Sequence, residues 1–170
     1  MRLRQRYWLA LGFDVAVLVL IFVSIAWWQS RHLLAADGSQ QAPQVALSSL
    51  DGQTYAIGGT RDQRTLVYFF APWCHVCGLS VGNLEWLRRS YDDQSLTIYL
   101  VALSYDSVAE VQAFVDDHGV TLPVLLGDAR IMADYRIRGF PTYYVIDDDG
   151  SLRHRAVGYS TFFGLWWRSL

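Results

Sequence analysis

The stretch APWCHVC, residues 71–77, holds both cysteines of this 170-residue chain. The apolar run LVYFF at residues 66–70 leads into it and predicts a buried strand. Leu79, Leu84 and Leu87 follow it and predict a helix with one buried face. Two thiols three positions apart at the start of a helix can form a small disulfide and open it again. This strand–CxxC–helix pattern therefore predicts a dithiol redox centre.

The two cysteines should differ in acidity. A free thiol has a pKa of about 8.5, and its thiolate is the nucleophile. Unpaired backbone N–H groups and the dipole at a helix N-terminus favour negative charge there. We therefore predict that Cys74 is the attacking thiolate and Cys77 the resolving thiol, which opens a mixed disulfide with the substrate. The disulfide itself is then the redox group, and we expect no further cofactor and no metal.

Three other interpretations of the cysteine pair remain. A zinc site usually needs four ligands, but the chain has no second cysteine pair, and His32, His118 and His154 lack ligand spacing. A structural disulfide would close a loop of four residues and gain little closure entropy. Two buried, inert cysteines are the third alternative. The redox interpretation is favoured because the strand, the Trp-Cys pair and the helix occur together.

The N-terminal region predicts a single membrane span over residues 7–28, which are almost wholly apolar. At about 1.5 Å per residue this segment can cross a hydrocarbon core of roughly 30 Å, and aromatic residues stand at both of its ends. Arginines dominate residues 1–6, so the positive-inside rule makes this tail cytoplasmic. The domain that follows is then extracytoplasmic (periplasmic), anchored in the inner, cytoplasmic membrane.

A cleaved signal peptide is the alternative for this segment. Its apolar core would be 7–15 residues long and would precede a small-residue cleavage site, which residues 34–36 match poorly. Asp14 interrupts the apolar run, either as a tolerated residue or as a polar contact with a partner helix. We favour a retained anchor with a tolerated aspartate.

Residues 29–42 are expected to form a short tether, and residues 43–170 a single domain of ordinary size. From residue 29 onward, 11 arginines face 15 acidic residues, and the chain has no lysine. This mildly acidic balance without basic clusters argues against a nucleic-acid partner. A chain whose only two thiols form one redox pair fits an oxidising compartment.

Periodicity and turn signals predict an α/β domain with a mixed central sheet, helices on both faces and an N-terminal β-hairpin around Asp51-Gly52. Val108, Val111, Phe114 and Val115 are expected on one helix face. The aromatic segment 162–167 is either a core-facing helix, which we favour, or an exposed partner patch. The expected strands are 45–49, 53–57, 65–70, 96–103, 124–126, 142–147 and 152–157, and the expected helices are 74–91, 107–118, 129–135 and 161–170.

Residues 73–77 together with 139–142 (Gly-Phe-Pro-Thr) resemble the thioredoxin superfamily. The order of elements is similar to the membrane-anchored bacterial subgroup typified by TlpA, ResA and the ScsD-type proteins, over about residues 43–168. This resemblance implies a thioredoxin-like fold and a protein thiol–disulfide oxidoreductase. It also implies a cis-proline at Pro141, with Phe140 and Thr142 beside it at the substrate-binding edge.

The same resemblance assigns redox tuning to Trp73, His75 and Val76, which surround the cysteines. A protonated His75 would stabilise the Cys74 thiolate and make the protein more oxidising. The alternative is an exposed histidine with little influence, and we leave both open.

Two positions depart from the family pattern. Family members often carry an acidic residue six positions before the first cysteine, where this chain has Tyr68, and ResA-like members carry a glutamate six positions after it, where this chain has Ser80. Such a carboxylate would help to move the proton of the resolving thiol. Glu85 is two turns further along the helix and is not expected to reach, so water or His75 must be considered instead.

The leading hypothesis is a reductase of specific protein disulfides that receives its electrons from a membrane partner. A dithiol oxidase of DsbA-like direction is the first alternative. A copper-handling thiol module is the second, because soft thiolates suit Cu(I). A peroxidase is less favoured. Residues 68–72 resemble the corresponding segment of thiol peroxidases, but the threonine expected near a peroxidatic cysteine is absent.

Overall fold

The computed structural model describes residues 12–21, 23–25, 31–60, 62–91 and 95–169. It separates into two compact units, Met1–His32 and Leu33–Leu170. The predicted cytoplasmic tail and positions 7–11, 22 and 26–28 of the predicted anchor lie outside the described residues. Among the described residues, no helix has both the length and the apolar character needed to cross a membrane.

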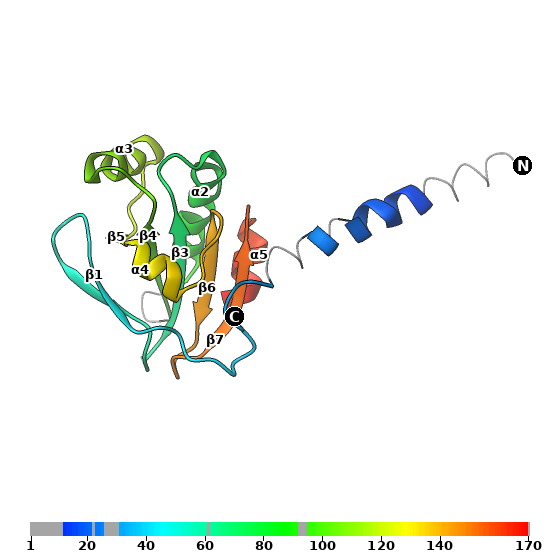
Figure 1. Cartoon of the computed structure of the whole chain (residues 1–170), viewed down its shortest axis with the longest axis horizontal. Helices are drawn as coiled ribbons and strands as arrows, with labels where there is room; N and C mark the ends of the chain where they lie inside the picture. Colours follow the sequence, from blue (N-terminus) through cyan, green and yellow to red (C-terminus); the bar gives the residue numbers. More distant parts are fainter. Residues whose placement is uncertain (1–11, 22, 26–30, 61, 92–94, 170) are drawn as a thin grey trace, which may run out of the picture. The chain divides into compact units, whose positions relative to one another are not determined.

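A mixed five-stranded sheet forms the centre of the second unit, with strand order β5-β4-β3-β6-β7 (Figure 1). Strand β3 pairs in parallel with β4 and antiparallel with β6, as the predicted fold requires. An antiparallel hairpin of β1 and β2 forms a separate two-stranded sheet. The strands are β1 Val45–Ser48, β2 Thr54–Ile57, β3 Arg64–Phe70, β4 Leu96–Ala102, β5 Val124–Leu126, β6 Thr142–Ile146 and β7 Leu152–Val157.

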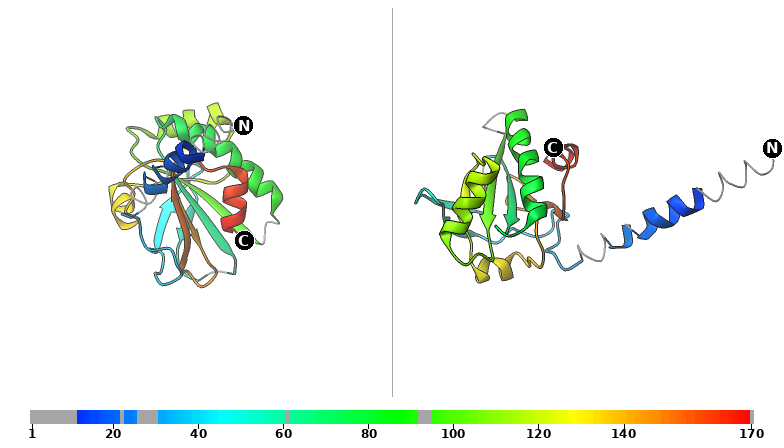
Figure 2. Two further views of the ribbon diagram at one scale, coloured as in Figure 1. Left: turned by 90° about the vertical axis from the view of Figure 1, so that its right-hand side faces the viewer. Right: turned by 90° about the horizontal axis from the view of Figure 1, so that it is seen from above.

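Helices cover both faces of this sheet. Helices α2, α3 and α5 pack on one face, in a core that includes Leu84, Phe114 and Leu165. Helix α4 and the hairpin pack on the other face, in a second core that includes Ile131 and Leu47. Figure 2 shows α2 and α5 next to each other in the first layer. The helices are α2 His75–Ser90, α3 Val108–His118, α4 Ala129–Asp134 and α5 Phe162–Ser169.

The central strand β3 contributes to both cores. Leu66, Tyr68 and Phe70 face the first core, while Val67 and Phe69 face the second. Successive side chains of a strand point to opposite faces, so a strand covered on both faces is apolar without interruption. This is why the run before the cysteines reads as continuous hydrophobic sequence.

Helix α3 begins and ends close to the predicted positions. Ser107 is its N-cap and accepts a hydrogen bond from the Glu110 backbone N–H. Gly119 ends it in the left-handed region, with φ of 59°, where glycine has no Cβ penalty. Its buried face is narrower than predicted: Val111 and Phe114 are buried and Val115 is partly buried, but Val108 in the first turn is exposed.

The segment from Leu33 to Ala42 belongs to the domain, although residues 29–42 were expected to form a tether. Leu33, Leu34 and Ala42 are buried. The Ala42 N–H donates to the Gly150 carbonyl at 2.9 Å, and the Leu152 N–H donates to the Gln40 carbonyl at 2.8 Å. The start of the edge strand β7 offers unpaired backbone groups, and this segment satisfies them.

The hydroxyl of Tyr144 fixes the same segment from the side of the sheet. It accepts a hydrogen bond from the Leu34 N–H at 3.1 Å and donates one to the Tyr135 carbonyl at 2.9 Å. Burial raises the pKa of Tyr144 to about 12, so the hydroxyl keeps the proton that it donates. The compact domain therefore begins at Leu33.

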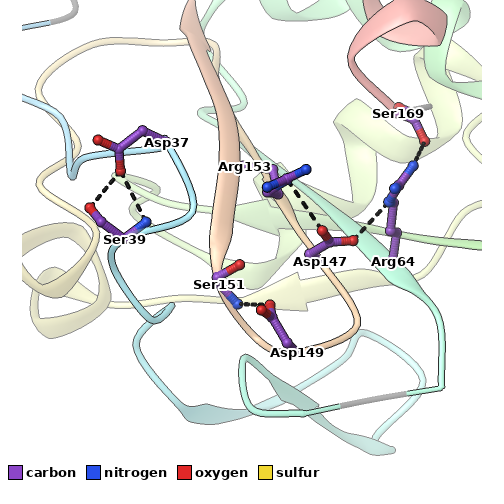
Figure 3. Close-up of polar contacts among 8 residues, drawn as sticks. All are labelled: Asp37, Ser39, Arg64, Asp147, Asp149, Ser151, Arg153 and Ser169. Carbon is purple, nitrogen blue, oxygen red and sulfur yellow. Dashed lines mark hydrogen bonds and ion pairs between the residues drawn. The ribbon is translucent and has the colours of Figure 1, made fainter.

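Ion pairs around Asp147 and a hydrogen bond from Arg64 join the end of the sheet opposite the cysteines to α5 (Figure 3). The Asp147 carboxylate pairs with Arg64 Nε at 2.8 Å and with Arg153 Nε at 3.2 Å. Arg64 also donates to the Ser169 carbonyl at 3.2 Å. One arginine thus connects β3, the end of β6 and the last turn of α5.

The predicted buried faces of α2 and of the segment 162–167 are wrong in part. Leu79 was expected on the buried face of α2 but is exposed, because that face centres on Cys77, Leu84 and Leu87. The segment 162–167 was expected to pack into the core, yet it buries only Leu165 fully. Three of its aromatic residues, Phe163, Trp166 and Trp167, are exposed because a single layer of helix over the sheet has an outer face.

Candidate active site

The two cysteines form a disulfide at the start of α2, with their Cα atoms 5.2 Å apart. Strand β3 ends at Phe70, and a short loop carries the chain from there into the helix. Cys74 is 8% exposed, whereas Cys77 is fully buried. Of the two cysteines, only Cys74 therefore retains any exposure through which a partner molecule could reach the pair.

Cys74 is the N-cap residue of α2. Its Sγ accepts a hydrogen bond from the Cys77 backbone N–H at 3.2 Å, in the place where a serine or aspartate oxygen usually caps a helix. The first turn of α2 contains no acidic residue. A thiolate at this position would keep the N–H contact and gain from the helix dipole, and both effects lower the pKa of a cysteine.

The loop before β6 lies beside the disulfide loop. The Phe140–Pro141 peptide bond is cis, as the resemblance implies. The Phe140 ring contacts Trp73 edge to face, with centroids 5.8 Å apart and an interplanar angle of 82°. Trp73 Nε1 donates to the Ser104 carbonyl at 2.8 Å, which holds the indole in place. These contacts bring together Trp73, Cys74, Phe140 and Pro141 from two distant parts of the chain.

The remaining predicted site residues take different positions. The Thr142 side chain is buried and its hydroxyl donates to the Gly139 carbonyl at 2.8 Å, so it does not face a substrate. His75 and Val76 are exposed in the first turn of α2, outside the contact between the two loops.

Two buried hydroxyls lie beneath the disulfide, at the positions where the sequence lacks the family carboxylates. The Tyr68 hydroxyl donates to the Cys77 carbonyl at 3.4 Å. Burial raises the pKa of Tyr68. Ser80 Oγ is itself buried without a hydrogen-bond partner among the described residues. The floor of the site is therefore polar but uncharged.

Glu85 is not available to the disulfide, as the sequence predicted, and the structure shows why. Its carboxylate accepts hydrogen bonds from the Thr121 backbone N–H at 2.7 Å, the Thr121 hydroxyl at 2.7 Å and the Leu122 backbone N–H at 3.2 Å. It ties α2 to the loop between α3 and β5.

Sequence reasoning missed His118, which was treated as a scattered histidine. Its ring lies against the first turn of α2, where a Cβ added to Gly78 would come within 2.1 Å of Nε2. Its Nδ1 is 2.9 Å from the Phe114 carbonyl. A glycine inside a helix, directly after the second cysteine, is the only sequence signal of this close approach.

One group of carboxylates has metal-ligand spacing among the described residues, namely Asp147, Asp148 and Asp149. It lies after β6, at the end of the sheet opposite the disulfide. Both oxygens of Asp147 are already paired with Arg64 and Arg153, and two members of the group are exposed. This cluster therefore gives no support to a metal centre.

Comparison with known proteins places this geometry in a family. Residues 39–155 match the AhpC/TSA family. The chain belongs to the AhpC/TSA family. Because its CxxC disulfide opens α2 and several of its relatives are named thiol-disulfide oxidoreductases, this AhpC/TSA family member is a protein thiol–disulfide oxidoreductase.

Three known proteins show how similar this AhpC/TSA family member is to its relatives in sequence and in fold. It is 28% identical over 163 residues to the thioredoxin-like protein YneN of Bacillus subtilis, covering 91% of each chain. It is 23% identical over 123 residues to the thiol-disulfide oxidoreductase ResA of Bacillus anthracis, covering 72% of this chain and 70% of ResA. The crystal structure of StoA from Bacillus subtilis matches with a TM-score of 0.66 at 19% identity, covering 80% of this chain and 100% of StoA. The thioredoxin-like fold is thereby confirmed.

Proposed function

We propose that the chain is a membrane-anchored, extracytoplasmic enzyme that reduces specific protein disulfides through Cys74 and Cys77. The observation that carries this proposal is the unequal exposure of the pair. Cys74 reaches solvent at the N-cap of α2, while Cys77 is fully buried behind it. One sulfur can meet a substrate and the other can act only on the first. That asymmetry suits a two-step exchange, whereas an inert disulfide does not require it.

The reduction proceeds in two balanced steps. The Cys74 thiolate attacks one sulfur of a substrate disulfide, a mixed disulfide forms, and the second substrate sulfur leaves as a thiolate. Cys77 then loses its proton and attacks Cys74 Sγ, which restores the Cys74–Cys77 disulfide and releases the first substrate sulfur. Two electrons pass to the substrate. A membrane partner with a dithiol would return two electrons by the reverse exchange.

The proton of Cys77 has no carboxylate to receive it within the described surroundings of the disulfide. Tyr68 is held neutral by burial, and Glu85 is occupied by Thr121 and Leu122. A released substrate thiolate, or water entering beside Cys74, takes that proton instead. The Trp73–Phe140 contact and the loop at Pro141 supply the surface on which the substrate backbone lies.

The direction of electron flow can be tested by the redox potential of the pair. We expect a value more negative than about −200 mV, because strong oxidants of this chemistry lie near −120 mV. His75 is exposed, so solvent screens its charge, and His75→Ala should shift the potential by less than about 30 mV. Equilibration with glutathione buffers measures both values. A wild-type potential near −120 mV, together with a large shift in the variant, would favour the oxidase alternative.

Anchoring through residues 7–28 rests on the length, apolar character and flanking arginines of that segment. We expect the full chain to remain in the membrane fraction after an alkaline carbonate wash, which strips peripheral proteins. A matched chain that begins at residue 29 should appear in the soluble fraction. Release of the full chain by the wash would contradict the anchor.

A further inference from the structure

We propose that the outer face of α2 and α5 docks on an anionic lipid surface. This inference rests on the proposed anchor and adds a second contact between the protein and the membrane. The α2–α5 face consists of large apolar side chains that the thiol chemistry does not use. Its members are Leu79, Trp86, Tyr159, Phe163, Trp166 and Trp167, all of them exposed.

These side chains share one surface because α2 and α5 cover the same face of the sheet and pack side by side (Figure 2). Asn83 Nδ2 donates to the Ser160 carbonyl at 2.9 Å, just before α5 begins. At the other end, the Tyr91 hydroxyl donates to the Trp166 carbonyl at 3.4 Å. The buried sides of both helices are fixed by Leu84 and Leu165, so the residues named above point away from the core.

The charges of these helices favour an anionic partner. Helices α2 and α5 carry three arginines, Arg88, Arg89 and Arg168, and their single carboxylate, Glu85, is buried against Thr121. The sequence from residue 29 onward is acidic overall, so the two helices together differ in sign from the rest of the domain. Arg168 lies over the Tyr143 ring and Arg88 borders Thr121 and Leu122, so Arg89 is the arginine that remains for the outer face. Tryptophan, phenylalanine and tyrosine beside arginine are the residues that occupy the boundary between lipid headgroups and acyl chains.

The length of chain before the domain argues for lipid as the occupant. Because the domain begins at Leu33, only residues 29–32 separate it from the end of the predicted span. Four residues extend over about 14 Å at most, so an anchored domain cannot leave the bilayer surface. Under that restraint, weak interfacial contacts act at high effective concentration.

The chain enters the domain at the β7 edge of the sheet, where Leu33 packs in the core on the α4 face, while α5 covers the other face. Arg155, on the edge strand β7, donates to the Leu33 carbonyl at 2.8 Å. Arg168 of α5 lies over the Tyr143 ring, on the neighbouring strand β6. Docking of the α2–α5 face would hold the first turn of α2 close to the headgroups. The Cys74 sulfur would then lie within reach of a membrane-embedded electron donor.

Three tryptophans provide an internal test, because their exposed fractions are similar. Trp73 is 66% exposed, Trp86 66% and Trp167 72%. The full chain would be placed in nanodiscs of mixed phosphatidylglycerol and phosphatidylcholine, one chain to a disc, and labelled with hydroxyl radicals. Docking predicts that Trp86 and Trp167 are labelled at least about threefold more slowly than Trp73 in the same sample, since buried side chains lose radical access. Equal labelling of all three would overturn the proposal.

A Phe163→Ser/Trp167→Ser double variant provides the matched control. Both side chains are exposed, so the fold and the reduction of a small soluble disulfide should be unchanged. Trp86 should then be labelled as fast as Trp73. Slow labelling of Trp86 and Trp167 without any lipid, increasing with protein concentration, would show that a second copy covers the face and would overturn the proposal. Incorporation into discs tests the proposed anchor, and disulfide reduction tests the proposed enzyme activity. A failure of either proposal can therefore be told apart from a failure of lipid docking.

Discussion

A Cys74→Ser variant should reduce protein disulfides at least about a thousandfold more slowly than the wild type, because the only sulfur exposed to a substrate is gone. A serine hydroxyl at this position cannot form a mixed disulfide. Cys77 cannot replace Cys74, since it is fully buried in the first turn of α2. Steady-state reduction of a protein disulfide, with a chemical dithiol as electron source, measures the loss.

The Cys77→Ala variant completes this test from the other side. It should attack a substrate disulfide once and then remain as a mixed disulfide on Cys74, because the resolving thiol is absent. Non-reducing electrophoresis and mass spectrometry would identify the trapped partner. Val108→Ala serves as a control, since this exposed residue of α3 has no part in the site and should leave turnover nearly unchanged. Turnover by Cys74→Ser, or trapping on Cys77, would reverse the assigned roles.

A Glu85→Ala variant should lose about 2–4 kcal/mol of unfolding free energy. Three hydrogen bonds from Thr121 and Leu122 end on this carboxylate, and two of them come from backbone N–H groups. Without it, the two N–H groups lose their charged acceptor, and α2 loses its connection to the loop before β5. Denaturant unfolding of the oxidised protein measures the difference.

Two further variants separate this effect from a general loss of charge. Glu85→Gln keeps one acceptor oxygen and should lose about half as much. Glu110→Ala removes an exposed carboxylate that accepts one backbone hydrogen bond, from Asp106, and should cost less than about 1 kcal/mol. A Glu85→Ala loss as small as that of Glu110→Ala would show that the Glu85 contacts contribute little.

The elements of the domain were predictable because their signals are local. Continuous apolar sequence marked β3, and Ser107 and Gly119 marked the ends of α3. The cysteine spacing and the proline at position 141 indicated the site. The tether was predicted too long because residues 33–42 show no helical or strand periodicity, although Leu33, Leu34 and Ala42 are buried. The hydrogen bonds of this segment go to Gly150 and Leu152, far away in the chain, and no local pattern reports them.

The sequence by itself determined the thiol chemistry, the order of strands and helices, and the absence of carboxylates at positions 68 and 80. Those properties depend on residue identity and on spacing along the chain. Only the tertiary structure decided which cysteine a substrate can reach, which groups Glu85 and His118 contact, and that Phe163, Trp166 and Trp167 of α5 face outward. Burial and contact arise when segments distant in sequence pack together, so they follow from the three-dimensional arrangement of the chain.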